Sequence, residues 1–405
     1  MKILQINTVY KHGSTGRIAH DLATEINAVG SECYFAYAHN SINYEKGIKI
    51  GNRFDSIFHN IGSRLMDRQG FFSLNATKSL ISNIEDINPD IIHLHNLHGN
   101  YINVDHLFKY LSIRNYPVVW TFHDCWPFTG HCAYFDLVNC DKWMSHCNTC
   151  PNQRNYPTSY FIDNSFENFE RKKYLFNSLS NLTIVTPSDW LATLVNKSFL
   201  SKYPVKVINN GIDTQIFKPK QNSELREYHK LSNETVVLLG VSSDGFKKRK
   251  GLESFLHLAN NLDNGYKIIL IGCTKEDVKL LPKNVIGIKR TENIEQLAAY
   301  YSIADIFLNP TLEDNFPTTN LEALACGTPV LTFNTGGSPE VIKSNTGSVV
   351  EKNNNEMLIN SVKTLNNKFK INNHKYCREY ALSKFDKTLM YNQYLALYNE
   401  ILASK

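Results

Sequence analysis

The sequence lacks long apolar runs, and this absence argues against a membrane-spanning or secreted protein. No stretch of about 18 consecutive apolar residues occurs among the 405, so no segment is expected to cross a bilayer. The first residues, MKILQINTVYKHG, hold too short an apolar run for a secretory signal and include polar Gln5 and Asn7. We therefore expect a cytoplasmic protein.

Cysteine is scarce, and neither sign of charge dominates. Nine cysteines is an odd number and a low density for a disulfide-stapled fold, which agrees with a reducing compartment. The 43 basic and 38 acidic residues give a net charge of +5. This mild excess permits an anionic substrate or membrane surface but does not indicate a nucleic-acid-binding protein. With 42% hydrophobic and 20% charged residues, the composition is that of an ordinary soluble protein, and the length predicts two or three domains.

Two successive series of short apolar segments predict an α/β protein with two parallel sheets. The first series lies at residues 3–6, 91–95, 117–122, 182–185 and 205–208, and the second at 235–241, 267–271, 285–288, 305–308 and 329–333. Helical spacing of apolar residues alternates with several of these segments, as at Ile18, Leu22 and Ile26, which is typical of a doubly wound fold.

A polar stretch at 213–233 separates the two series. We therefore expect two Rossmann-like domains, over 1–215 and 216–380, and a C-terminal helix over 381–405 that packs across both. Ligands of such sheets bind beyond the carboxyl ends of the strands, which predicts a site in a cleft between the domains.

The segment from Asn309 to Pro329 carries the strongest chemical pattern. Pro317 suits the first turn of a helix and Gly327 suits its end. The helix N-terminus would direct N–H groups at a phosphate. Asp314 and Glu322 offer carboxylates that accept hydrogen bonds from sugar hydroxyls. A solvated acidic loop followed by a surface glutamate is the alternative.

A basic run, Lys247 to Lys250, follows the first strand of the second domain and precedes Gly251. Lysine and arginine fixed at this place can neutralise a diphosphate leaving group without a metal ion. A solvated charged loop is the plainer interpretation of the run. Its position after a strand favours the functional one.

Two features of the first half point to the same edge of its sheet. The loop Gly13 to Gly16 can form a nest of N–H groups for an anion, or be a plain turn between strand and helix. His123 follows the strand at 117–122 and can donate a hydrogen bond to a transferred sugar or orient an acceptor. We interpret His93 and His95 as hydrogen-bonded residues beneath the site.

Four cysteines, Cys132, Cys140, Cys147 and Cys150, lie within 19 residues and include a CxxC pair. This spacing predicts a structural zinc site in an insertion at about 125–155, with free thiols as the alternative.

The segment at 53–82 alternates basic residues (Arg64, Arg68, Lys78) with apolar ones. Such a pattern is found in helices that lie on an anionic membrane and, more often, in helices packed on their own domain.

Several of these residues resemble a known family signature. Asp314, Phe316, Glu322, the run at 323–330 and the Gly-Gly-Ser-Pro-Glu at 336–340 are similar to the donor site of the retaining glycosyltransferase family 4, which has the two-domain GT-B fold. The resemblance implies transfer from a UDP- or GDP-linked sugar by front-face attack, without a catalytic metal ion. It implies that Asp314 contacts the sugar and Glu322 the ribose. The family usually has Glu at position 314, and Glu313 is the alternative contact.

The resemblance also assigns the remaining site residues. The implied catalytic residues are His123, Asp314 and Lys250, and the implied donor-binding residues are Gly16, Arg249, Lys250, Thr291, Asp314, Asn315, Phe316, Pro317, Thr318 and Glu322. Related enzymes of capsule, O-antigen or colanic-acid assembly carry a similar Cys-rich insertion. They imply a saccharide acceptor, lipid-linked as one alternative, and peripheral contact with the inner membrane. A hydrolase or phosphorylase on the same fold, or a non-catalytic nucleotide-sugar-binding protein, are the rival functions.

Overall fold

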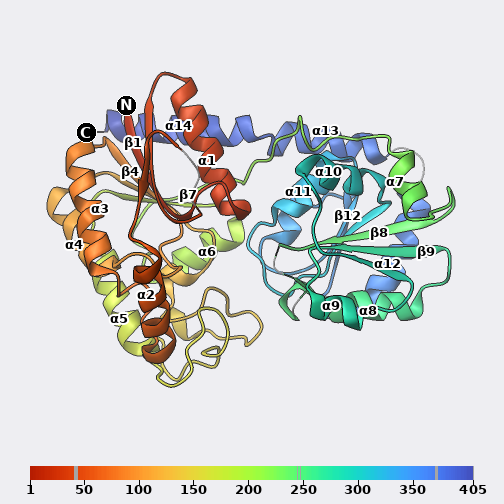
Figure 1. The fold of residues 1–405 in the computed structure, drawn as a ribbon, viewed down its shortest axis with the longest axis horizontal. Coiled ribbons are helices and arrows are strands. Elements are labelled where there is room, and N and C mark those ends of the chain that lie inside the picture. Colours follow the sequence, from red (N-terminus) through yellow and green to blue (C-terminus); the bar gives the residue numbers. More distant parts are fainter. Residues whose placement is uncertain (41–43, 244, 247, 370–372, 405) are drawn as a thin grey trace. The chain divides into compact units, whose positions relative to one another are not determined.

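Two parallel sheets organise the chain in the computed structural model, which describes residues 1–40, 44–243, 245–246, 248–369 and 373–404 (Figure 1). The first unit comprises Met1–Asn209 and Tyr391–Lys405, and the second comprises Asn210–Met390. The sequence placed this division at 215 and 216. It falls earlier because Ile212, just before the predicted linker, pairs with the backbone of Phe385 and Asp386 and so belongs to the second unit.

The first unit has the strand order β3-β2-β1-β4-β5-β6-β7, with every pair parallel. Its strands are β1 Lys2–Val9, β2 Glu32–His39, β3 Gly47–Lys49, β4 Ile91–Leu94, β5 Val118–Thr121, β6 Leu182–Thr186 and β7 Val205–Val207. Its helices are α1 Gly13–Ala28, α2 Arg53–Met66, α3 Leu74–Ile87, α4 Val104–Arg114, η1 Trp126–Phe128, η2 Lys142–Met144, α5 Ser165–Phe176 and α6 Asp189–Lys197.

The second unit has the strand order β10-β9-β8-β11-β12-β13, again parallel throughout. Its strands are β8 Val236–Val241, β9 Tyr266–Ile271, β10 Val285–Ile288, β11 Ile306–Asn309, β12 Val330–Phe333 and β13 Gly347–Val350. Its helices are α7 Ser223–Tyr228, η3 Lys248–Lys250, α8 Leu252–Asn261, α9 Lys275–Leu280, α10 Ile294–Ile303, α11 Thr318–Ala325, η4 Ser338–Val341, α12 Asn355–Phe369 and α13 Asn373–Phe385. Figure 1 shows α8, α9 and α12 on one face of this sheet and α10, α11 and α13 on the other.

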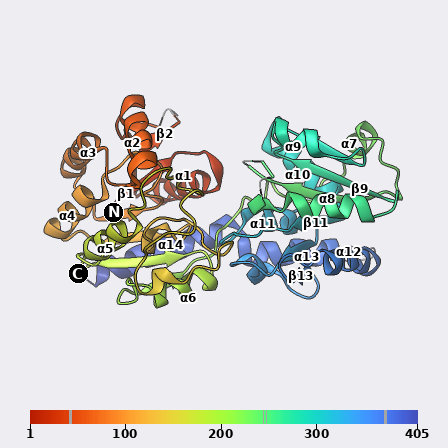
Figure 2. The same ribbon diagram turned by 90° about the horizontal axis from the view of Figure 1, so that it is seen from below.

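The last helix, α14 Lys387–Ala403, begins in the second unit and ends in the first. Both chain ends therefore belong to the first unit, as Figures 1 and 2 show from two sides. Tyr394 and Tyr398 of this helix are buried in the first unit, where their hydroxyls hydrogen-bond Thr121 and His93.

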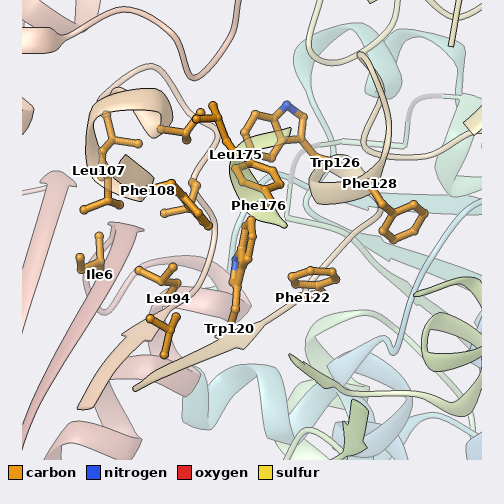
Figure 3. Close-up of a cluster of buried hydrophobic side chains, with 14 of the residues drawn as sticks. Ile6, Leu94, Leu107, Phe108, Trp120, Phe122, Trp126, Phe128, Leu175 and Phe176 are labelled. Atoms are coloured by element: carbon orange, nitrogen blue, oxygen red, sulfur yellow. The ribbon is translucent and has the colours of Figure 1, made fainter. Parts of the chain in front are cut away.

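The core of the first unit is rich in aromatic rings (Figure 3). Trp120 on β5 packs between Phe108 of α4 and Phe176 of α5, with ring centroids 5.3 and 4.9 Å away. Buried aromatic rings supply much of the apolar area that holds helices to a sheet. This packing fixes β5, and with it the residues that follow its carboxyl end.

Candidate functional site

The loop between β11 and α11, together with α11 itself, holds most of the predicted donor residues. β11 is fully buried, and the chain leaves it through Pro310 before Pro317 caps the start of α11. Proline lacks an N–H and has a fixed φ, so it suits a helix start. Gly327, with a φ of +84°, ends the segment in the left-handed conformation that glycine tolerates.

Two glycines hold this loop from opposite sides. A Cβ on Gly251 would lie 2.1 Å from the carbonyl oxygen of Pro310, and one on Gly336 would lie 1.8 Å from that of Asp314. Both have a positive φ, of +73° and +55°. The loop can approach its neighbours this closely because both positions lack a side chain.

Lys250 and Arg249 of η3 lie beside Asp314 of this loop. Lys250 Nζ lies 2.6 Å from Asp314 Oδ2, and the two side chains are 19% and 14% exposed. Arg249 donates from its guanidinium to the carbonyl oxygen of Glu313 at 2.8 Å. Burial alone would raise the pKa of Asp314, but the charges of Lys250 and Arg249 outweigh it and hold that pKa below its usual value. The carboxylate therefore stays ionised beside two cations, which places a hydrogen-bond acceptor next to positive charge.

Glu322 lies on α11, buried at 2% exposure. Its Oε2 accepts a hydrogen bond from the hydroxyl of Tyr301 at 2.9 Å. The backbone of Tyr301 is held in turn by the hydroxyl of Thr328, at 2.6 Å. The alternative of a surface glutamate is therefore wrong: this carboxylate is oriented inside the unit. Tyr301 was not among the predicted site residues, because its place in an apolar helical pattern gave no sign of this contact.

A buried polar network fixes the start of α11 to the sheet. Asn309 Nδ2 donates to Asn320 Oδ1 at 2.8 Å, and Asn320 Nδ2 donates to Ser338 Oγ at 3.0 Å. Ser338 Oγ also lies 2.7 Å from the hydroxyl of Thr332, which donates to the Asn309 carbonyl. Buried polar groups that satisfy one another impose a unique geometry. The sequence offered one signal of this network: Asn320 stands at a position of the helix where an apolar residue is expected.

The other predicted donor residues take different positions in the second unit. The backbone N–H of Asn315 donates to Asp314 Oδ1 at 3.0 Å. The ring of Phe316 packs edge-on against Phe385 in the core, and its part in donor binding stays a prediction. Thr318 opens α11 and is partly exposed. Thr291 lies in the loop between β10 and α10, partly exposed, and takes no part in the hydrogen bonds above. Lys247 and the side chain of Lys248 lie outside the described residues.

In the first unit, a chain of hydrogen bonds fixes the proton positions on His123. Gln5 Nε2 donates to Ala19 O and Cys33 Sγ, so Gln5 Oε1 is the group that accepts from His95 Nε2, at 2.8 Å. A neutral His95 then accepts at Nδ1 from His123 Nε2, 3.2 Å away. Burial lowers the pKa of His123 to about 4, so this imidazole is neutral near pH 7. His123 Nδ1 therefore carries a lone pair and acts as a hydrogen-bond acceptor.

His93 and His95 are hydrogen-bonded core residues, as predicted. His93 Nε2 lies 2.8 Å from the hydroxyl of Thr121, and His93 Nδ1 lies 2.7 Å from that of Tyr398. Burial lowers the pKa of His93 to about 3. These contacts explain the histidines without a metal ion.

Gly13 and Gly16 form the first turn of α1, and the expectation of a loop ahead of the helix is wrong. The helix starts at Gly13 because the N–H of Lys11 bonds to the Gly16 carbonyl at 3.1 Å, which folds the β1–α1 connection tightly. A Cβ on Gly16 would lie 3.1 Å from a methyl group of Val9. His12 at the N-cap makes no side-chain capping bond.

The four clustered cysteines all have free thiols. Cys132 and Cys150 are hydrogen-bonded to each other, and this bond, aided by nearby His131, lowers the pKa of Cys150 to about 7. Cys147 Sγ accepts from the N–H of Gly130 at 3.2 Å. Among the residues that the structure describes, no group of three or more His, Cys, Asp or Glu side chains is arranged to hold a metal ion. The zinc site, with Cys140 as its fourth ligand, stays a prediction.

The segment at 53–82 splits into two helices with different surroundings. In α3, Leu80 is buried in the core, so this helix packs on its own domain. In α2 only His59 and Ser63 are buried, and a stripe of large apolar side chains faces outward. We call this stripe the α2 face. Its residues are Phe54, Ile57, Phe58, Ile61, Leu65 and Met66.

Models of known protein families match both units. A model of glycosyl transferases group 1 matches residues 221–384, and a model of glycosyltransferase family 4 matches residues 15–216. With the two Rossmann-like sheets, these matches define a glycosyltransferase of GT-B fold. The chain belongs to glycosyltransferase family 4, which confirms the predicted family, fold and enzyme class.

Individual relatives are distant but cover most of the chain. A putative colanic acid biosynthesis glycosyl transferase of Escherichia coli is 24% identical over 368 residues, which is 87% of this chain and 88% of that protein. The sucrose-phosphate synthase of Thermosynechococcus elongatus has a TM-score of 0.75 at 16% identity, over 100% of both chains. HepE of Anabaena in complex with UDP-glucose has a TM-score of 0.67 at 16% identity, also over 100% of both chains.

Proposed function

We propose that this glycosyltransferase moves a sugar, with retention of anomeric configuration, from a nucleotide diphosphate to a saccharide acceptor in the assembly of a cell-surface polysaccharide. The observation that carries the proposal is the ion pair between Lys250, at the end of η3, and Asp314 on the β11–α11 loop, which combines fixed positive charge with an ionised carboxylate. HepE, which shares the fold, binds UDP-glucose, and the E. coli relative is named for colanic acid biosynthesis. We infer a UDP- or GDP-linked donor on that basis.

In this proposal Lys250 and Arg249 stabilise the departing diphosphate. Phosphate oxygens compete with Asp314 for the Lys250 ammonium, and charge-assisted hydrogen bonds of this kind act without a metal ion. Asp314, or Glu313 in its place, accepts from the donor sugar hydroxyls. Glu322 accepts from the ribose, held ready by Tyr301. Thr318 and its neighbours at the start of α11 direct N–H groups at the phosphates, since Pro317 has no polar side chain to cap them.

The role of His123 follows from its protonation. Because Nδ1 is an acceptor, His123 orients an acceptor hydroxyl rather than donating to the transferred sugar. The imidazole is a weak base with a pKa of about 4, so the proton of the attacking hydroxyl passes to the leaving phosphate in front-face attack. His123 is then a positioning group, and its loss raises KM for the acceptor more than it lowers kcat.

The experiment is transfer by the purified full-length enzyme from a panel of UDP- and GDP-sugars, with the product anomer read by NMR. Lys250→Ala and Glu322→Ala should each reduce transfer by about 100-fold or more, the loss expected when a preorganised charge is removed. Lys363→Ala and Glu356→Ala, which change exposed residues of α12, are the matched controls. Full transfer by Lys250→Ala and Glu322→Ala would refute the assigned roles. Release of free sugar without acceptor would favour a hydrolase.

We further propose a lipid-linked acceptor and peripheral membrane contact through the α2 face. The spacing of its apolar residues forms one helical stripe, yet the stripe faces solvent, with Phe54 and Phe58 69% and 72% exposed. The loop after the Cys-rich insertion extends this surface, because the N–H of Tyr160 bonds to the Arg64 carbonyl at 2.9 Å and Phe161 is 75% exposed. None of the described helices is long and apolar enough to cross a bilayer.

Charge supports an anionic membrane as the partner of the α2 face. Arg53 and Arg64 lie on α2, Arg68 follows it, and Arg154 and Arg64 both contact the ring of Tyr160. No ion pair among the described residues includes any of these arginines. Aromatic and aliphatic side chains flanked by arginine are typical of helices at the surface of anionic lipid.

Co-sedimentation with vesicles tests this contact. The full-length protein should bind vesicles of phosphatidylglycerol and phosphatidylcholine more strongly than pure phosphatidylcholine, and less at high salt. The double variant Phe54→Ser and Phe58→Ser should lose most of this binding. Ile113→Ser, at an exposed position on α4, should keep it. Equal binding by the double variant and the wild type would contradict the proposal.

A further inference from the structure

A cavity of about 490 Å³ opens in the first unit at the carboxyl ends of β2 and β3, beside the start of α2. Ala38 and His39 end β2, Lys49 ends β3, and Asn52 caps α2. Parallel sheets bind ligands at this edge, and the volume is that of a small-molecule site. Of its lining residues only Ile57 and Arg53 have a role above, at the α2 face.

The described lining of this cavity is mostly polar and carries positive but no negative side chains. Six polar residues provide most of it: Lys49, Arg53, Asn40, Asn52, Asn60 and Asn100. No carboxylate is found among its described lining residues. Carboxamides hydrogen-bond to hydroxyls and to phosphate oxygens, whereas two cations without a carboxylate select for an anion.

The two cations are not neutralised by the protein. In the part of the chain that the structure describes, no ion pair includes Lys49 or Arg53. The acid nearest to Arg53 in sequence, Asp55, is engaged elsewhere, because its carboxylate accepts from the N–H of Asn52 in the cap of α2 at 2.9 Å. Partial burial lowers the pKa of Lys49, which marks an ammonium that is less well solvated than usual.

The wall opposite α2 is held rigid before any ligand arrives. His39 Nε2 bonds to the Gly99 carbonyl at 2.8 Å, and the hydroxyl of Thr8 bonds to the carbonyls of Asn96 and His98 at 3.0 and 2.6 Å. Gly99 has a φ of +110°, and a Cβ there would lie 2.5 Å from a methyl group of Thr8. Preorganised walls reduce the entropic cost of binding.

We propose that this cavity holds the phosphate-bearing end of the acceptor, a saccharide joined to a phosphate or diphosphate ester, with Lys49 and Arg53 opposite the phosphate oxygens and the asparagines opposite sugar hydroxyls. The inference rests on the proposed function and names the class of its acceptor. Ile57 lines the cavity and also belongs to the α2 face, so the polar pocket borders the surface assigned to the membrane. A lipid-linked acceptor presents this combination of a polar head and an apolar tail.

Binding of matched probe pairs tests the proposal, with the full-length protein kept saturated with UDP so that the donor site is filled. The pairs are glucose 1-phosphate against methyl α-glucoside, and farnesyl diphosphate against farnesol. The phosphorylated member of at least one pair should bind more than about tenfold tighter than its neutral partner. Lys49→Gln and Arg53→Gln should each weaken that binding by about tenfold, the effect of one charge-assisted hydrogen bond.

Lys78→Gln, at an exposed position of α3 in the same unit, is the matched control and should bind like the wild type. Preference for the farnesyl pair identifies the lipid carrier as the source of the phosphate, and preference for the glucose pair identifies a sugar phosphate. The proposal is overturned if neither pair shows a phosphate preference, or if Lys49→Gln and Arg53→Gln, folded by tryptophan fluorescence, bind unchanged.

The failure of this inference differs from a failure of the proposed function. Lys49→Gln and Arg53→Gln should leave the affinity for UDP unchanged, whereas Lys250→Ala should lower it. If UDP does not bind the wild type, the donor assignment is wrong. The same probe pairs, measured without UDP, still test whether the cavity prefers a phosphate ester.

Discussion

Acidification should destabilise the first unit far more than the second, because four of its histidines, His59, His93, His95 and His123, are buried in the neutral form. Burial lowers the pKa of His59 and His93 to about 3 and that of His123 to about 4. In the unfolded chain each would titrate near 6.5. Below that pH the unfolded state binds protons that the folded state rejects, so stability is fully present above 6.5 and falls as the pH falls.

The size of the effect follows from the pKa values. Between pH 7.5 and pH 5.0 His59, His93 and His123 each cost about 2 kcal/mol of unfolding free energy, or about 6 kcal/mol together, and His95 adds to this loss. A domain is stable by only about 5–15 kcal/mol, so this loss takes most of the reserve. His131 acts in the opposite direction, since burial is outweighed by its contact with Asp67 and its pKa is raised. It offsets part of the loss.

Tryptophan fluorescence can isolate the first unit. All four tryptophans, Trp120, Trp126, Trp143 and Trp190, lie in that unit. Urea unfolding followed by fluorescence therefore reports the first unit, whereas circular dichroism reports both. The fluorescence midpoint should fall steeply between pH 7.5 and 5.0, ahead of the remaining dichroism change.

Two variants separate the histidine effect from general acid sensitivity. His123→Gln should recover about 2 kcal/mol of the difference between the two pH values, because it removes one suppressed titration. His146→Gln, an exposed position in the same unit, should recover none. A fluorescence midpoint that is unchanged at pH 5.0, or equal recovery by both variants, would refute the reasoning.

Three further predictions concern the second unit and the cysteine cluster. Tyr301→Phe removes the hydrogen bond to Glu322 and should raise KM for the donor about fivefold, corresponding to about 1 kcal/mol, with kcat nearly unchanged in steady-state assays. Gly336→Ala drives a Cβ into the Asp314 carbonyl and should lower UDP affinity in calorimetry and destabilise the second unit by more than about 1 kcal/mol in dichroism-monitored unfolding. If the zinc prediction is right, elemental analysis will find one zinc per chain that Cys150→Ser loses; a metal-free wild type would leave free thiols.

The strand series was predictable from sequence because buried parallel strands consist of apolar runs. All ten predicted strands are present, from β1 to β12. Three others were missed for physical reasons. β2 contains alanine, tyrosine and histidine instead of valine and isoleucine, β3 has only three residues at the sheet edge, and β13 begins with Gly347 and Ser348.

The candidate site was predictable where a single stretch of chain carries it. Arg249 and Lys250 come from the connection after β8 and Asp314 from the loop after β11, and they meet because these neighbouring strands end at one edge of the sheet. The residues that hold the site residues in place were not predictable. Tyr301 and Ser338 act through partners 21 and 18 residues away, and no local pattern encodes such pairs.

The return of α14 to the first unit makes the order of synthesis matter. Residues 391–405 belong to the unit that leaves the ribosome first, and Tyr394 and Tyr398 complete hydrogen bonds to Thr121 and His93. The amino-terminal part of the first unit therefore cannot complete its packing against these tyrosines until the entire second unit has been translated. Every nonsense codon upstream of position 391, however late in the gene, removes a piece of the first unit as well.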